Sequence, residues 1–268
     1  MKQLYDTIGV GYAKSRPADQ RIVQGLAAAL DLPVGAVILD VGAGTGKYAR
    51  ALADRGFHLL AVEPSDVMRR QGLPHPRVSL IPASAEVLPL AAGAAAGAII
   101  VLALHHFRDR ATALREVLRV IGRGPLVIFT FEPRDLSAFW LCEYFPRLGG
   151  TEGNSFLELA DVAGEVRRLT GRTVHSIPFP LPRDLTDQFG AAGWARPESY
   201  LQAEVRNGIS SFALMDPSEV ASGVARLRED LASGRWDQRH GSLRQQSHWD
   251  AGYRFIVAKD LTPGTAAD

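Results

Sequence analysis

The sequence predicts an α/β fold in which short strands and helices alternate around a mostly parallel sheet. Short apolar runs recur through the first half of the chain, and glycine turns or amphipathic stretches separate them. Unbroken apolar runs are typical of strands that helices cover on both faces. A chain of 268 residues with 46% hydrophobic residues can bury a large core, as one domain or as one domain with a cap.

The first strand, turn and helix follow one another almost without a gap. The apolar run 37–41 contains one acid, Asp40, and the stretch 47–54 has the composition of a helix. Between them lie three glycines, Gly42, Gly44 and Gly46. Glycine adopts backbone angles that other residues resist, and it lets backbone N–H groups approach a ligand closely.

An acid ends the second strand. The apolar run 59–62 is followed by Glu63, which comes 17 residues after Gly46. A carboxylate at that place can accept two hydrogen bonds from the hydroxyls of a ribose. Strand, glycine turn, helix, strand and acid together predict a site for a nucleoside cofactor.

Several interpretations of the glycine turn compete. A nicotinamide site favours Gly-x-Gly-x-x-Gly, whereas the third glycine here comes one residue early. An ATP-type phosphate loop needs a hydroxyl residue after Gly-Lys, but Tyr48 stands there. A glycine turn in an α/β domain can also exist without any ligand.

The remaining pattern is Asp-x-Gly-x-Gly-x-Gly, which starts at Asp40, with Glu63 at the end of the next strand. It resembles motif I and the ribose-binding acid of the class I S-adenosylmethionine (SAM) dependent methyltransferases. The resemblance implies methyl transfer from SAM to a small-molecule acceptor. A nicotinamide-dependent oxidoreductase and a non-catalytic SAM- or nucleoside-binding module are the alternatives.

Two later segments extend the resemblance. After the apolar run 78–81 the family reads roughly Asp-Ala-Glu-x-Leu-Pro, and this chain has Ser84 where the acid is common. The resemblance implies that Ser84 and Ala85 contact the adenine. The apolar run 97–104 ends in His-His-Phe, as in the ubiquinone/menaquinone-methyltransferase-like small-molecule subgroup, and this implies a cofactor contact at Leu102.

The first half closes with a helix and a strand. Apolar residues over 113–121 recur at helical spacing, and a fifth apolar run covers 125–131. The resemblance thus spans about residues 1–131. It implies a Rossmann-like sheet of seven strands, mostly parallel with an antiparallel last strand, and a small helical cap.

The second half departs from strict alternation. We expect a helix from Ser155 to about Leu169, then an extended or edge segment over 173–180, because the prolines at 178, 180 and 182 forbid a central strand. The other expected elements are a helix over 184–194, a sixth strand over 199–202, a helix over 219–232 and a last strand over 252–258.

The resemblance implies a single methyltransferase domain over residues 1–268. Its expected parts are an N-terminal lid and helix (1–30), the SAM-binding core (31–131), a cap insertion (132–188), the end of the core (189–260) and a tail (261–268).

The segment before Pro17 is rich in aromatic and basic residues, and Asp19 is expected to cap a helix over 20–30. In the subgroup, a similar segment folds over the cofactor. This implies that Tyr5 and Tyr12 form a lid and that Arg16 pairs with the methionine carboxylate, since a guanidinium can bind a carboxylate through two parallel hydrogen bonds. An N-terminal helix packed on the sheet is the alternative.

His105 is the candidate catalytic residue. It follows the fourth strand, where an acceptor would meet the methyl group, and an imidazole titrates near neutrality. Shaping of the pocket is the alternative role. His106 is expected to point to the opposite side if the strand continues. Glu132, the pair Arg183-Asp184 and the segment 206–212 are candidate acceptor contacts.

Composition excludes several functions. The 30 basic residues balance 29 acidic ones, which argues against a general nucleic-acid binder. A single cysteine, Cys142, excludes an internal disulfide framework and a cysteine metal cluster, and the histidines outside the 105–106 pair are too scattered for a metal site. No apolar stretch is long enough to span a bilayer, and we expect a cytoplasmic protein.

Overall fold

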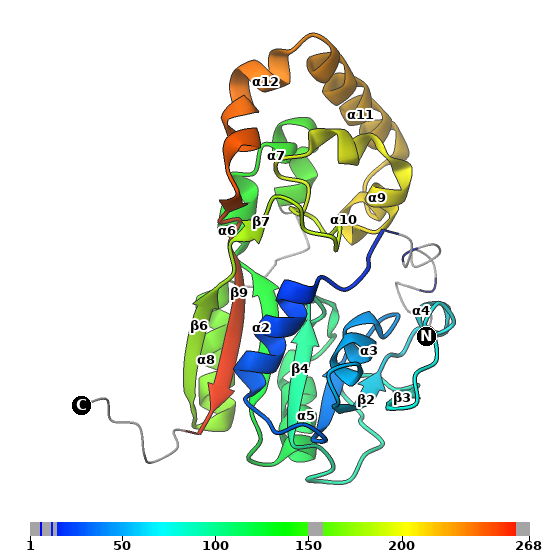
Figure 1. Cartoon of the computed structure of the whole chain (residues 1–268), viewed down its shortest axis with the longest axis vertical. Helices are drawn as coiled ribbons and strands as arrows, with labels where there is room; N and C mark the ends of the chain where they lie inside the picture. The colour runs from blue at the N-terminus through cyan, green and yellow to red at the C-terminus, as the bar shows by residue number, and fades with distance from the viewer. Residues whose placement is uncertain (1–5, 7–11, 13–14, 150–157, 261–268) are drawn as a thin grey trace, which may run out of the picture.

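The computed structural model describes residues 6, 12, 15–149 and 158–260. Two lobes lie one above the other along the long axis (Figure 1). The lower one, the sheet lobe, holds the main sheet and the helices on its two faces. The upper one, the helical lobe, is formed by the segments 133–149 and 179–249.

The sheet lobe contains seven strands in the order β3-β2-β1-β4-β5-β9-β6. β9 pairs antiparallel with both β5 and β6, and the other neighbours pair parallel. The predicted seven-stranded, mostly parallel sheet with an antiparallel last strand is therefore confirmed. The strands are β1 (Val37–Val41), β2 (His58–Val62), β3 (Val78–Ile81), β4 (Gly97–Val101), β5 (Leu126–Phe131), β6 (Thr173–Pro178) and β9 (Tyr253–Lys259).

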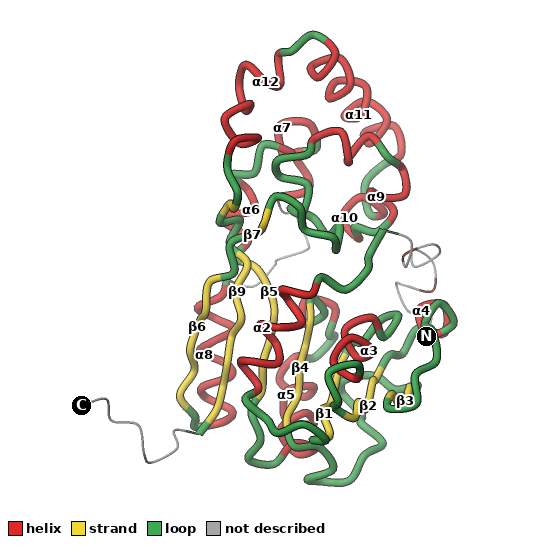
Figure 2. Tube along the Cα trace, viewed as in Figure 1, coloured by secondary structure: helices red, strands yellow, loops and turns green. Residues whose placement is uncertain are grey.

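Helices cover both faces of this sheet, and each face has its own apolar core. Figure 2 shows α2 in front of the sheet, with α5 and α8 behind it. Asp19 caps α2 as predicted, because its side chain accepts a hydrogen bond from the backbone N–H of Arg21. The helices of this lobe are α2 (Gln20–Leu30), α3 (Lys47–Ala53), α4 (Asp66–Arg69), α5 (Arg110–Ile121) and α8 (Leu159–Thr170).

The helical lobe is held together by large aromatic side chains. The Trp140 ring packs edge to face against Trp236 and Tyr200, with ring centroids 5.2 and 5.7 Å apart, and its Nε1 donates to the carbonyl of Trp194 at 2.8 Å. The elements are α6 (Pro133–Ser137), α7 (Leu141–Tyr144), η3 (Pro146–Gly149), β7 (Leu181–Pro182), η4 (Pro197–Leu201), α9 (Ala203–Asn207), α10 (Ser210–Ala213), α11 (Pro217–Ala232), α12 (Arg235–His240), η5 (Gly241–Gln245) and β8 (His248–Trp249).

Three expectations for the second half need correction. The segment 199–202 is not a strand but belongs largely to the 3-10 helix η4, and Tyr200 is completely buried in the helical lobe. The sixth strand of the sheet is instead the proline-bounded edge strand β6, where a missing N–H is tolerated. The segment 184–194 forms turns, not a helix. The helical lobe thus draws on two separate segments and not on the single stretch 132–188.

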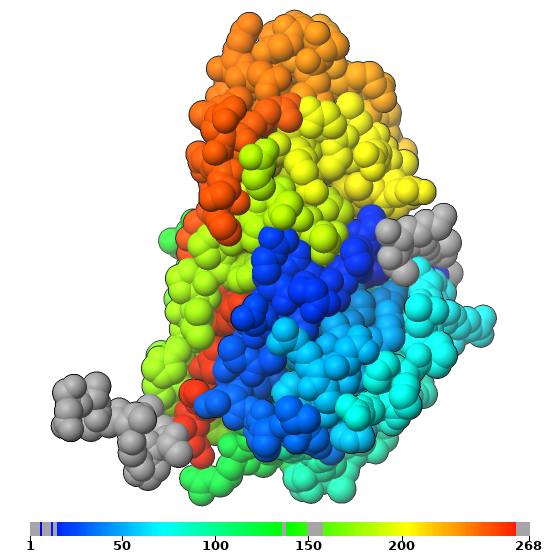
Figure 3. Space-filling model, in the orientation of Figure 1, coloured from blue at the N-terminus to red at the C-terminus, as the bar shows by residue number. Residues whose placement is uncertain are grey.

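The segment before α2 lies where the two lobes meet. Figure 3 shows α2 and the residues just before it covering this junction on the visible face. Among the residues that the structure describes, no helix combines the length and the apolar character needed to cross a bilayer.

Candidate active site

The glycine turn after β1 has a left-handed backbone at each of its three glycines, with φ of 73° at Gly42, 59° at Gly44 and 71° at Gly46. A Cβ added to Gly42 would also lie 2.6 Å from the Cβ of Ala103. Side chains at these positions would therefore strain the backbone, and at Gly42 they would collide with the segment after β4.

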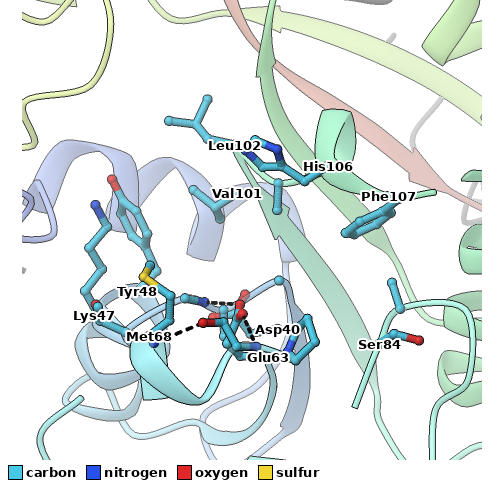
Figure 4. Close-up of a pocket in the computed structure, with 18 of the residues that line it drawn as sticks. Asp40, Lys47, Tyr48, Glu63, Met68, Ser84, Val101, Leu102, His106 and Phe107 are labelled. Carbon is cyan, nitrogen blue, oxygen red and sulfur yellow. Dashed lines mark hydrogen bonds between the residues drawn. The ribbon is translucent and has the colours of Figure 1, made fainter. Parts of the chain in front are cut away.

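Glu63 is held by backbone amides at the end of β2. Its Oε2 accepts from the N–H of Gly44 at 2.9 Å and its Oε1 from the N–H of Ser65 at 2.8 Å (Figure 4). Burial raises the pKa of Glu63, although these two hydrogen bonds oppose the shift. The carboxylate is thus fixed in direction at the edge of a pocket.

Asp40 is the second acid of the site, and only 2% of it is exposed. Its Oδ2 has no hydrogen-bond partner among the described residues. Burial, together with the charge of Glu63, raises the pKa of Asp40 to about 7. A buried carboxyl oxygen without a partner is uncommon and points to a group that a ligand completes.

These groups line one pocket, which we call the cofactor pocket, at the carboxyl ends of β1, β2 and β4. The predicted cofactor residues that line it are Tyr12, Arg16, Asp40, Gly42, Gly44, Glu63, Ser84, Ala85 and Leu102. Gly46 does not line it but precedes the first turn of α3, and Tyr5 lies outside the described residues. Sequence reasoning missed Lys47, Met68 and Phe107, which also line the pocket.

The strand β4 does not continue to the histidines. Leu102 has a φ of 51°, which is rare for a branched residue, and the 3-10 helix η2 (Leu104–His106) follows it. This turn places His106 in the cofactor pocket, and Figure 4 shows it beside Leu102. The expectation that His106 faces away from the site is therefore wrong, because it assumed an extended backbone.

The comparisons with known proteins agree with this geometry. The family described as "Methyltransferase domain" matches residues 39–129. A solved structure from Anabaena variabilis ATCC 29413, assigned as a methyltransferase from an antibiotic biosynthesis pathway, is 44% identical with a TM-score of 0.88, and the match covers 91% of this chain and 99% of that one.

The chain belongs to the class I SAM-dependent methyltransferases.

Curated relatives match over shorter segments. An uncharacterized methyltransferase of Mycobacterium tuberculosis (strain H37Rv) is 36% identical over 109 residues, which are 40% of this chain and 44% of that protein. The ubiquinone/menaquinone biosynthesis C-methyltransferase UbiE of Syntrophotalea carbinolica is 32% identical over 140 residues, or 46% of this chain and 59% of that protein. The chain thus spans about half the length of the curated relatives that it matches.

SAM is the cofactor of this methyltransferase, and the cofactor pocket suits it. The fixed carboxylate of Glu63 fits two ribose hydroxyls, and the buried carboxyl group of Asp40 fits a ligand that carries positive charge. The described residues contain no group of His, Cys, Asp and Glu side chains that could hold a metal ion.

Arg16 is buried and already has an anionic partner. Its Nε donates to Oδ1 of Asp187, and its Nη1 donates to the carbonyl of Gly208 at 2.6 Å. Oδ2 of the same aspartate accepts from Nζ of Lys47 at 2.6 Å and from the hydroxyl of Tyr48 at 2.7 Å. Sequence reasoning missed Asp187, because a single acid in an irregular segment carries no local signal.

The charges of this cluster depend on one another. Burial alone would raise the pKa of Asp187, but the charges of Arg16 and Lys47 outweigh it and hold the pKa below its usual value. Burial, and then the charge of Arg16, lower the pKa of Lys47 to about 7. The methyltransferase thus places the guanidinium of Arg16 and a lysine that is only partly protonated near neutral pH around one carboxylate, and both side chains line the cofactor pocket.

A second pocket adjoins the first, and we call it the junction pocket. It shares Tyr12, Arg16 and Leu102 with the cofactor pocket, and His105 lines it as well. The helical lobe contributes residues from the candidate segment 206–212, namely Ile209, Ser210 and Ser211. Arg206 itself donates to the carbonyl of Tyr200 at 2.7 Å.

Both histidines are neutral at physiological pH. Burial, together with the neighbouring His106, holds the pKa of His105 well below its usual value. Burial alone lowers the pKa of His106 to about 4. Their rings lie 3.9 Å apart between centroids, so one histidine borders each pocket where the two pockets meet.

Proposed function

We propose that this methyltransferase transfers a methyl group from SAM to a small molecule that binds in the junction pocket. The observation that carries the proposal is that the two pockets share three residues, Tyr12, Arg16 and Leu102. An acceptor in one pocket would therefore meet the reactive end of a cofactor in the other. Alignment of this kind can supply on the order of 7–11 kcal/mol of rate acceleration.

Separate parts of the chain would hold separate parts of the cofactor. We assign Glu63 to the ribose hydroxyls and the segment of Ser84 and Ala85 to the adenine. The methionine end would lie by the glycine turn, with Arg16 and Tyr12 closing over it. All of these residues line the cofactor pocket, which supports the assignment.

SAM supplies an electrophilic methyl group. The protein orients the acceptor and excludes water, which the apolar side chains Leu102, Phe107 and Met68 support. His105 is placed to receive a proton from an acceptor that carries one, since a neutral imidazole can accept it.

The acceptor would be a small molecule and not a nucleic acid, because the chain has balanced charge and no excess of basic residues. A cytoplasmic location remains a prediction from the sequence. A module that only senses SAM has less support, because a sensor needs no second pocket next to that of the cofactor.

Calorimetry tests the cofactor assignment directly. SAM and S-adenosylhomocysteine should bind, and NAD should bind far more weakly. Gly44→Val should abolish binding, because φ is 59° there and a branched side chain resists that angle. Gly171→Val is a matched control, because Gly171 caps the end of α8 with a φ of 67° and lies outside both pockets. Equal loss of SAM binding in both variants would mean that misfolding, and not the site, explains the effect.

A further inference from the structure

Five of the eleven described residues that line the junction pocket carry aromatic rings, and four of these rings contact one another in a row. Ring centroids lie 5.9 Å apart between His105 and Phe131, 5.6 Å between Phe131 and Tyr253, and 4.7 Å between Tyr253 and Phe189. The guanidinium of Arg16 lies 5.9 Å from the ring centre of Phe189. Such walls favour a flat apolar ligand that can pack edge to face or offset against them.

The charge of the pocket restricts the ligand further. Among the described residues that line it, Arg16 alone carries a formal charge, and Asp187 already balances that charge. The described lining residues include no carboxylate, and burial holds the pKa of His105 well below its usual value, so its imidazole is neutral. An ammonium group in this pocket would lose its water and find no anionic partner among the described lining residues, and a cation–π contact with the rings would offset only part of that cost.

The polar atoms that remain suit a hydroxyl group. Ser210 and Ser211 carry hydroxyls that can donate or accept a hydrogen bond, and the imidazole of His105 can accept a proton. The serines come from the helical lobe and the histidine from the sheet lobe, so a hydroxyl-bearing ring could be held between the lobes.

We propose that the junction pocket binds the acceptor through an aromatic ring that bears a hydroxyl group, and that it rejects amines that are protonated at neutral pH. This inference rests on the proposed function, because it names the class of acceptor for the same methyl transfer. The reaction is then an O-methylation of a phenol.

The atoms and charges of this reaction balance within the site. The phenol O–H bond breaks and its proton moves to the imidazole of His105. The phenol oxygen forms the new C–O bond as the C–S bond breaks, and the electron pair of that bond goes to sulfur. One positive charge thus moves from sulfur to the imidazole, so the net charge of the buried site does not change, and the proton later leaves to solvent.

The junction pocket is smaller than the cofactor pocket. Its volume is about 70 Å³, against about 200 Å³ for the cofactor pocket. Gly190 forms part of its wall, and a Cβ added there would meet only the hydroxyl oxygen of Tyr253, at an ordinary distance of 3.7 Å. Gly190→Ala therefore narrows the pocket without disturbing the fold.

The test compares matched acceptors with the full-length protein and SAM. Phenol and 2-naphthol are paired with benzylamine and 2-naphthylmethylamine, and release of S-adenosylhomocysteine is measured by mass spectrometry at pH 7.5. The hydroxyl compounds should show at least a tenfold higher kcat/KM than the amines. Gly190→Ala should lower kcat/KM for 2-naphthol at least tenfold and leave SAM affinity unchanged. Gly164→Ala, on the open surface of α8, should change neither kcat/KM for 2-naphthol nor SAM affinity.

A second variant separates the proton-accepting role of His105 from a structural one. His105→Asn should lower turnover of 2-naphthol by ~10²–10⁴ with little effect on SAM affinity. The turnover of 4-nitrophenol should fall much less in this variant, because 4-nitrophenol is largely ionised at pH 7.5 and needs no base. An equal loss for both phenols would overturn the proton step.

The outcomes distinguish the two levels of the proposal. Failure of the protein to bind SAM would overturn the proposed function itself. Two results would overturn the acceptor class and leave methyl transfer intact. In the first, the protein binds SAM and turns over the amines faster than the phenols. In the second, the protein binds SAM but neither binds nor turns over either phenol.

Discussion

Asp40 in the sheet lobe lines the cofactor pocket, whereas Asp187 in the helical lobe lies behind lining residues of that pocket, and the surroundings of the two buried acids differ. Asp187 is fully buried and accepts from three side chains, those of Arg16, Lys47 and Tyr48. Asp40 is 2% exposed, and its Oδ2 has no partner among the described residues. The pKa of Asp187 is lowered, whereas the pKa of Asp40 is raised to about 7.

The difference shows that burial alone does not decide the charge of a carboxyl group. Partners from the sheet lobe and the N-terminal segment keep Asp187 ionised, so it connects the lobes as a structural anion. Oδ2 of Asp40 has no such partner among the described residues, and a positively charged ligand can supply one. Variants at four positions test this contrast, and their expected effects decrease in the order given.

Asp187→Ala should have the largest effect. It leaves the cations of Arg16 and Lys47 buried without their carboxylate, and removal of one partner from a buried ion pair costs about 3–5 kcal/mol. Urea denaturation should show a free energy of unfolding lowered by about that amount. Unchanged stability would mean that Asp187 does not anchor the helical lobe.

Glu63→Ala sharpens the comparison. Glu63 is buried and has hydrogen-bond partners, as Asp187 does, but it also lines the cofactor pocket, as Asp40 does. The variant loses two charge-assisted hydrogen bonds to ribose, each worth roughly 1.5–3 kcal/mol. SAM affinity measured by calorimetry should fall at least about tenfold. Glu63→Gln should lose less, because its amide oxygen keeps one acceptor. Wild-type affinity in Glu63→Ala would exclude the ribose role.

Asp40 should make SAM binding depend on pH. The free protein holds the pKa of Asp40 near 7, and the positive charges of SAM favour its ionised form. Binding therefore releases a proton, and affinity should rise about tenfold between pH 6 and pH 8 and then level off.

Lys47 has a pKa of about 7 as well, and it would act in the opposite direction by losing its charge as pH rises. The ratio of wild-type to Asp40→Asn affinity removes this contribution, because both proteins contain Lys47. The ratio should increase with pH. A ratio that stays constant between pH 6 and pH 8 would show that Asp40 does not meet the cofactor.

Asp184→Ala is the matched control with the smallest expected effect. Asp184 lies three residues before Asp187 and pairs with Arg21, but its side chain is 75% exposed. Exposed ion pairs are screened by water and contribute little. Urea midpoint and SAM affinity should both match the wild type. A loss of stability as large as that in Asp187→Ala would show that any substitution in this segment destabilises the protein, and that the buried carboxylate has no special role.

Local sequence signals predicted the sheet lobe well. The glycine turn, Glu63, the apolar strands and the cap at Asp19 are each encoded within a few residues, and the structure has these elements where they were expected. The roles assigned to the site residues remain predictions until a ligand is measured.

The features that sequence reasoning missed depend on contacts between distant residues. Asp187 meets Lys47 and Arg16 across 140 and 171 positions, and no spacing rule reports such pairs. Tyr200 was expected in a strand, but its hydroxyl accepts from the N–H of Gly193 and donates to the carbonyl of Gly190, which builds a compact turn. His106 was placed on the wrong side because the left-handed angle at Leu102 has no sequence signature in a leucine.

The two-segment construction of the helical lobe has a consequence for engineering. Trp140 belongs to the segment 133–149, whereas its ring partners Tyr200 and Trp236 belong to 179–249, and β6 of the main sheet lies between the segments in sequence. A chimera that imports one contiguous cassette from a relative would replace only half of this aromatic core. A transplant of the helical lobe therefore requires both segments together, so that Trp140 keeps matched ring partners.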